Sequence, residues 1–174
     1  PAAEQGPPVV TAWGGTPPRG AGAGTAEGGD PRTGGPATLA GFVFPLALPV
    51  GAPASYRDAF LDPGPVACAG ARRQCALTIA SAPGRHVVAA VAGTLRIASP
   101  AELEEGIGFW IETGDGDRVG YGPLPAYAPG IAQGVAVSPG RPLGLGSGGL
   151  RFAWERDGAR IDPHPLLEAT RPSA

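Results

Sequence analysis

The sequence predicts an all-β domain preceded by a Gly/Pro-rich segment. Of its 174 residues, 30 are glycine and 22 are proline, and both residue types interrupt helices. Short apolar runs alternate with turn signals that contain Gly, Pro or Asp, a pattern typical of antiparallel strands. A chain of this length has room for one ordinary domain and a tail.

The composition divides the chain into three segments. Residues 1–38 contain ten Gly and seven Pro and no periodic apolar positions, so they cannot bury enough surface to offset the entropy of ordering. We expect this segment to be a disordered tether. The β domain should cover residues 39–169, and a tail should cover residues 170–174.

The strands are expected from apolar and β-branched runs. Residues 42–46 (FVFPL) predict a first strand that proline closes, and residues 87–97 predict a later strand with a bend at its glycine. Two hairpins are expected, one with arms 108–112 and 117–124 and one with arms 149–155 and 159–161. Their turns carry Gly114-Asp115-Gly116 and Asp157-Gly158, and Asp162-Pro163 should end the sheet.

One short helix is expected after the bent strand, through about Glu105. Ser99 fits the N-cap position, proline follows at the first turn, and Glu102 completes a capping box. The adjacent acids at this helix end, Glu104 and Glu105, and those at the first hairpin tip, Asp115 and Asp117, are interpreted as solvated charges.

The totals also exclude some functions. A net charge of −2 and the lack of a basic cluster argue against binding of nucleic acid, and no apolar run reaches the roughly 18 residues of a membrane helix, so membrane insertion is not expected. Cys68 and Cys75 fit a small disulfide loop and an extracytoplasmic location. Two buried free thiols are the alternative.

Several motifs occur in the order found in lysostaphin-type (LytM-like) zinc metallopeptidases, which cut peptide bonds in bacterial peptidoglycan. Residues 78–95 resemble the stretch that follows the first zinc ligands, and residues 121–124 (YGPL) resemble a Tyr-x-His-Leu strand. Residues 131–144 resemble the Gly-rich turn ladder of that family, and residues 149–152 (GLRF) stand where it has His-x-His. The resemblance covers about residues 42–168. It implies a single strongly bent antiparallel sheet with long loops and at most one short helix.

The resemblance places other residue types at every catalytic or zinc-binding position. Gln74 and Thr78 stand where the family has its ligand His and Asp, Gly149 and Arg151 replace His-x-His, and Pro123 replaces the strand histidine. An amide and a hydroxyl are weak, uncharged zinc ligands. We therefore expect no catalytic site, no metal site and no cofactor. Pro123 suggests in addition that its strand lies at an edge.

The expected function is that of a non-catalytic module of the bacterial cell envelope, with an oligomeric state that the sequence leaves open. Such a module would hold a peptide, a peptidoglycan fragment or an envelope protein in the groove where the family holds zinc. Arg151 should enter that groove while its two neighbours face the opposite side, and it could receive a carboxylate; an internal ion pair or a solvated position is the alternative. An active metallo-endopeptidase with an atypical ligand set that includes Cys75 or His86, and a structural assembly domain, stay open.

Overall fold

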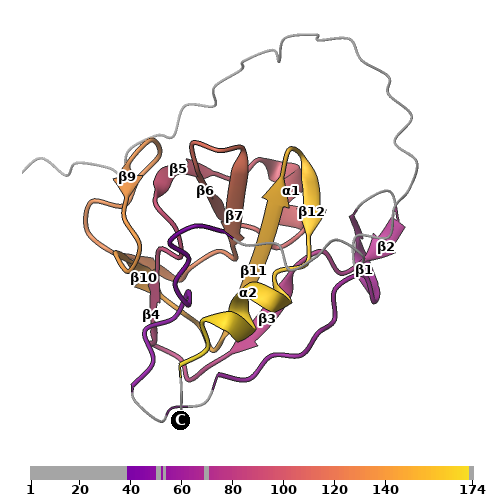
Figure 1. Ribbon diagram of the computed structural model, residues 1–174, viewed down its shortest axis with the longest axis horizontal. Coiled ribbons are helices and arrows are strands. Elements are labelled where there is room, and N and C mark those ends of the chain that lie inside the picture. Colours follow the sequence, from indigo (N-terminus) through magenta and orange to yellow (C-terminus); the bar gives the residue numbers. More distant parts are fainter. Residues whose placement is uncertain (1–38, 50–51, 53, 69–70, 173–174) are drawn as a thin grey trace, which may run out of the picture.

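The computed structural model describes residues 39–49, 52, 54–68 and 71–172 and shows antiparallel strands with two short helices (Figure 1). The all-β prediction is confirmed. The strands are β1 (Pro63–Cys68), β2 (Ala71–Arg73), β3 (Leu77–Ala80), β4 (His86–Val88), β5 (Gly93–Ile97), β6 (Phe109–Glu112), β7 (Asp117–Tyr121), β8 (Ala126–Tyr127), β9 (Ala136–Val137), β10 (Pro142–Leu145), β11 (Gly149–Arg156) and β12 (Ala159–Ile161); the helices are α1 (Pro100–Glu104) and α2 (His164–Ala169). The expected tether, residues 1–38, lies outside the described residues, as do the last two residues of the expected tail. The domain boundaries stay a prediction.

The antiparallel sheet is divided into three hydrogen-bonded parts. The largest has seven strands, in the order β12-β11-β7-β6-β5-β9, with β3 also paired to β11. β3 and β12 pair with successive halves of β11. A three-stranded part has the order β4-β10-β8, and β1 and β2 form a separate pair. β11 therefore holds three other strands of the large sheet in register.

The larger of two hydrophobic clusters, the main core, contacts both larger sheets, and Tyr121 of β7 connects them. Its side chain is fully buried, and its ring stacks on Phe109 at 5.0 Å between centroids. Its hydroxyl accepts a hydrogen bond from the Ala90 N–H at 2.7 Å and donates one to the Val88 carbonyl at 3.3 Å. Because a buried hydroxyl needs such partners, these bonds fix where the chain passes from the small sheet to the large one.

Both predicted hairpins form. In the second, Arg156 of β11 lies opposite Ala159 of β12, which leaves Asp157 and Gly158 as the two turn residues. Their φ angles are +49° and +79°, the left-handed conformation that a type I′ turn needs and that Asp-Gly readily adopts. In the first hairpin, β6 and β7 pair on either side of residues 113–116, as predicted.

Helix α1 has the predicted capping box. The Ser99 hydroxyl accepts the Glu102 N–H, and the Glu102 carboxylate accepts the Ser99 N–H at 2.7 Å. The helix ends at Glu104 with Glu105 as its C-cap, and the next residue, Gly106, has a φ of +80°. The Gly106 N–H donates to the Leu103 carbonyl and the Ile107 N–H donates to the Glu102 carbonyl, both at 2.9 Å, which is a Schellman motif. The chain is thereby turned back over the sheet.

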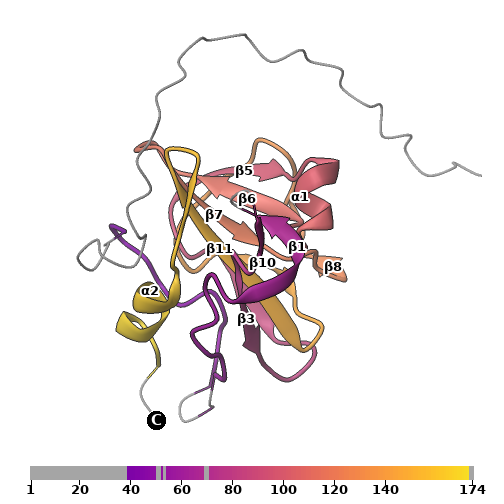
Figure 2. The same cartoon turned by 90° about the vertical axis from the view of Figure 1, so that its right-hand side faces the viewer.

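The expectation of at most one short helix is wrong, because α2 is a second helix. It begins directly after Asp162-Pro163, and the Asp162 carboxylate accepts the His164 N–H at 2.9 Å. Its buried residues, Leu166 and Leu167, belong to the core. Six residues are too few for a helical period to emerge from the sequence. The two helices lie on opposite sides of the seven-stranded sheet (Figure 2).

Two strand predictions need correction. Residues 42–46 run beside β4, with hydrogen bonds such as Val88 N–H to the Pro45 carbonyl at 2.9 Å, but form only an isolated bridge. Proline at this point has no N–H for a continuous ladder. The predicted strand 87–97 is split between β4 and β5, which belong to different sheets, because residues 89–92 carry the chain from one to the other.

Candidate functional site

The candidate site lies on the outer face of the seven-stranded sheet, opposite the core. Along β11, Leu150, Phe152 and Trp154 enter the main core, whereas Arg151 and Glu155 belong to the other face. This alternation is the one predicted around Arg151. Helix α1 and the turn that follows it lie over the same outer face (Figure 2).

Two of the residues predicted at ligand positions lie side by side. Arg151 of β11 is the register partner of Thr78 of β3, and Thr78 is exposed. Gly149 is close to the same threonine, because a Cβ atom at position 149 would lie 3.4 Å from its Cγ2. Thr78, Gly149 and Arg151 therefore form one small group on neighbouring strands.

Gln74 does not join this group. It precedes β3, where its N–H donates to the Asp62 carbonyl at 2.9 Å and its carbonyl accepts the Leu61 N–H at 2.8 Å. Its side chain lies against Gly64, since a Cβ there would be 2.9 Å from the Gln74 Cγ. Gln74 anchors the β1–β2 region to the preceding loop.

Pro123 is exposed and comes two residues after the end of β7. The inference that its strand is at an edge is wrong, because β7 lies between β6 and β11. The ladder has already ended at Tyr121, so the missing proline N–H interrupts no strand pairing. Instead, Pro123 lies close to the backbone of Gly108, where a Cβ would be 2.6 Å from its Cα.

The Arg151 side chain is half-buried beneath the turn that ends α1. A Cβ at Gly106 would lie 2.8 Å from its Cδ and 3.0 Å from its Nε. The Nε–H is buried and has no hydrogen-bond partner in the described part of the chain. Burial and the nearby positive charge of Arg160 lower the pKa of Arg151, against an opposing effect of Glu105.

A small cavity lies beside this guanidinium. Its volume is about 10 Å³, and its lining is Arg73, Cys75, Ala76, Glu105, Ile107, Arg151 and Arg160. Such a volume holds about one water molecule. The outer face at this point is thus nearly filled, and what it offers chemically is positive charge and N–H donors.

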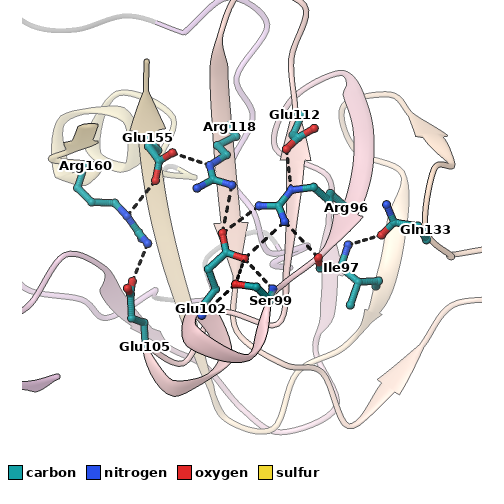
Figure 3. A network of polar contacts seen from close by, with 10 residues as sticks. All are labelled: Arg96, Ile97, Ser99, Glu102, Glu105, Glu112, Arg118, Gln133, Glu155 and Arg160. Carbon is teal, nitrogen blue, oxygen red and sulfur yellow. Dashed lines mark hydrogen bonds and ion pairs between the residues drawn. The ribbon is translucent and has the colours of Figure 1, made fainter. Parts of the chain in front are cut away.

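A chain of alternating charges covers the rest of the outer face (Figure 3). In order it runs Glu105, Arg160, Glu155, Arg118, Glu102, Arg96 and Glu112, with separations of 2.6, 3.2, 2.7, 3.1, 2.9 and 2.7 Å. We call these seven residues the charge network. The arginine side chains are only 11–30% exposed, so their ion pairs are screened less than those of a fully exposed surface.

Trp110 lies beneath this network and is fully buried. The guanidinium carbons of Arg118 and Arg160 lie 4.1 and 4.8 Å from its ring centroid, within the range of cation–π contact. Gly120 makes room for the ring, because a Cβ there would approach it to 2.7 Å. The packed tryptophan and the network above it close the outer face.

The sequence does not predict this network. Glu105 is predicted to be a solvated charge, but it pairs with Arg160 at 2.6 Å. Asp117, also interpreted as solvated, is buried and accepts hydrogen bonds from the Trp154 Nε1 at 2.8 Å and the Arg156 Nε at 2.9 Å. A usable signal was the opposite charges on the two arms of each predicted hairpin, for example Glu155 across from Arg160.

The two histidines lie apart from Arg151. His86 is on β4 in the small sheet, and His164 of α2 packs edge-on against Tyr56. Cys75 lines the small cavity but carries no free thiol. Among the described residues, no three His, Cys, Asp or Glu side chains are grouped as a metal site would require.

A larger hollow lies elsewhere, on the small sheet. It has a volume of about 330 Å³ and is lined by His86, Ala126, Tyr127, Ala128, Pro129, Pro142, Gly144 and Leu145. Two of these are large exposed apolar side chains, Tyr127 and Leu145. Of the candidate residues from the sequence, this lining includes only His86, which was considered as a ligand of an atypical zinc site, and none of the residues at the family's ligand positions. No helix among the described residues is long and apolar enough to cross a membrane.

Known structures of similar fold include lysostaphin-type peptidases. The catalytic domain of the antimicrobial peptidase lysostaphin from Staphylococcus simulans matches with a TM-score of 0.51 and 21% identity, over 66% of this chain and 92% of that one. A chain from the crystal structure of the SpoIIIAH and SpoIIQ complex matches with a TM-score of 0.50 and 18% identity, over 70% and 99%. The predicted resemblance is confirmed at the level of the fold.

Csd3 from Helicobacter pylori also matches, with a TM-score of 0.50 and 21% identity over 70% of this chain. The chain spans about a third of the length of Csd3, since the match covers 34% of it. No family model and no curated protein matches the sequence.

Proposed function

We propose that this chain, which has the fold of the lysostaphin-type peptidases, is a non-catalytic binding or regulatory module of the bacterial cell envelope. Its ligand would be a peptide, a peptidoglycan fragment or an envelope protein bound at the outer face of the large sheet. The observation that carries the proposal is the pair Thr78 and Arg151 on neighbouring strands. A hydroxyl and a guanidinium bind anions and peptide groups, whereas zinc needs carboxylate, imidazole or thiolate.

The closed outer face supports the same proposal. A hydrolase must admit a water and a scissile bond at its reacting centre, but Arg151 lies under the Gly106 turn beside a cavity of about 10 Å³. The charge network and Trp110 occupy the neighbouring surface. These contacts suit recognition of a group presented from outside.

The fold neighbours support either kind of ligand. One of them is an antimicrobial peptidase and another belongs to a complex of two proteins. We propose an extracytoplasmic location and a Cys68–Cys75 disulfide. The absence of a free thiol at Cys75 favours the disulfide, while the side chain of Cys68 lies outside the described residues.

Two measurements on the full chain test the proposal. Elemental analysis after incubation with excess zinc should give no stoichiometric metal, and the protein should be retained on purified peptidoglycan. Arg151→Ala should lose retention with a nearly unchanged Tm, because its buried Nε makes no hydrogen bond that the variant would break.

Each measurement has an outcome against the proposal. One tight zinc per chain with release of peptide from the cell wall would identify an active endopeptidase. A large fall in Tm for Arg151→Ala with unchanged retention would make Arg151 a structural residue. Arg85→Ala is the matched control, since Arg85 precedes β4 in the other sheet.

A further inference from the structure

We propose that the small cavity between Arg73, Arg151 and Arg160 binds the carboxylate of a peptide. This inference rests on the proposed function and names the chemical group that such a module would recognise at its outer face. It is carried by the positive charge around the cavity, the unsatisfied donor of Arg151 and the small size of the cavity.

The charge around the cavity is positive. Three arginine residues and one acidic residue, Glu105, are among its lining. That carboxylate is engaged by Arg160, which it meets at 2.6 Å and which also contacts Glu155 at 3.2 Å. Arg73 is exposed and contributes its charge at the rim. An anion that enters would therefore meet more positive than negative charge.

Arg151 supplies a donor that lacks an acceptor. Its Nε–H is buried without a hydrogen-bond partner in the described residues, and a buried donor that is left unsatisfied is unfavourable. Burial is the largest cause of the lowered pKa of Arg151. The next is the positive charge of Arg160, whose repulsion is stronger than the attraction of Glu105. A bound carboxylate would supply both the acceptor and the compensating charge.

The size of the cavity favours a carboxylate over a bulkier anion. About 10 Å³ admits one oxygen atom, and a flat carboxylate can insert one oxygen while the other stays at the rim beside Arg73. The Gly106 turn holds the Arg151 side chain in place, because its backbone packs on the Cδ and Nε atoms. A donor that is held in place loses little entropy on binding.

The test uses the full chain and a matched pair of probes, N-acetyl-alanyl-alanine and its C-terminal amide. NMR titration that follows the arginine Nε–H signals should show the acid shifting the Arg151 signal and binding about tenfold or more tightly than the amide. Arg151→Lys should weaken acid binding by about tenfold, because lysine cannot present the guanidinium edge. Arg85→Lys, away from the cavity, should leave it unchanged.

A second variant separates binding from folding. Arg73→Gln changes an exposed side chain, so the variant should keep the native spectrum. Its affinity for the acid should fall by about threefold or more, because a positive charge is lost. Equal binding of acid and amide, no detectable binding of the acid, or an acid affinity indifferent to Arg151→Lys would overturn the carboxylate site. Tighter binding of inorganic phosphate than of the acid would overturn it as well.

Failure here is distinguishable from failure of the proposed function. Retention on peptidoglycan without preference for the acid would refute the carboxylate site and leave the envelope module standing. Preference for the acid in a chain that also holds one zinc would refute the non-catalytic module and support the carboxylate site.

Discussion

Glu102→Gln should destabilise the protein through charge alone. The Glu102 carboxylate accepts the N-cap Ser99 N–H at 2.7 Å and lies 2.9 Å from Arg96 and 3.1 Å from Arg118. Glutamine has the same shape and can still complete the capping box. The substitution therefore keeps the cap and removes the two ion pairs at the centre of the charge network.

The expected loss is about 2 kcal/mol of unfolding free energy at pH 7. A hydrogen bond to a charged group contributes about 1.5–3 kcal/mol, and the Glu102 side chain is 13% exposed. Its partners are more accessible, at 30% for Arg96 and 23% for Arg118. Because solvent screens the charges of these partly exposed arginines, the two ion pairs together contribute about 2 kcal/mol.

This loss should depend on pH. Burial alone would raise the pKa of Glu102, but hydrogen bonds from Arg96 and Ser99 outweigh it and lower the pKa from 4.5 to about 2. A carboxyl with a lower pKa in the folded state stabilises the protein above its unfolded pKa. That stabilisation is lost as the pH falls from about 4.5 through 2. The difference between wild type and Glu102→Gln should therefore shrink over this window.

Urea unfolding at pH 7, 5, 3 and 2 measures the effect. The matched control is Glu104→Gln, two residues further along the same helix, where the side chain is exposed and the change should cost less than about 0.5 kcal/mol. Equal losses for the two variants would refute the ion-pair argument. So would a Glu102→Gln loss that persists undiminished at pH 2.

Three further predictions concern the packing of Trp110, the Gly106 turn and the disulfide. Gly120→Ala should lower stability by about 1–3 kcal/mol in urea unfolding, because the new Cβ meets the Trp110 ring at 2.7 Å. Gly106→Ala should cost about 1–2 kcal/mol for its positive φ and also weaken binding of N-acetyl-alanyl-alanine, because it displaces Arg151. Thiol titration of the unreduced, denatured chain should find no reactive Cys75, and reduction should add two thiols and about 2 Da in mass.

Matched glycines provide the controls. Gly114→Ala places its Cβ in open space and should change stability far less than Gly120→Ala. Gly134→Ala has the same positive φ as Gly106 but open space around it, so it should show the strain without the loss of acid binding. Equal binding losses at the two positions would contradict the role given to Arg151, and free thiols in the unreduced chain would contradict the disulfide.

Local signals predicted the local structure well. Ser99 with Glu102 predicted both the start and the cap of α1, and Asp157-Gly158 predicted a turn that forms with both φ angles positive. The order of family motifs predicted the fold, since such motifs mark turns and buried strand positions. Proline at position 45 predicted the end of a strand but not that its neighbours would form a single bridge.

The candidate site was predicted only in part, because its contacts depend on register between distant segments. Arg118 and Glu155 are 37 positions apart, and Glu105 meets Arg160 only after α1 has folded over the sheet. Arg151 was identified through the family motif, and its alternation followed from the strand. The Gly106 turn above it left no sequence signal beyond a glycine at a helix end.

The place of β11 after ten of the other strands in chain order has a consequence for biogenesis. Its residues 149–156 supply the partner for β3, β7 and β12, so the large sheet cannot close while the ribosome still holds this stretch. Pairing with β3 joins segments about 70 positions apart, and contacts between such distant segments form slowly. β3 and β7 therefore have no β11 partner until residues 149–156 have left the ribosome, and the large sheet is completed only after that.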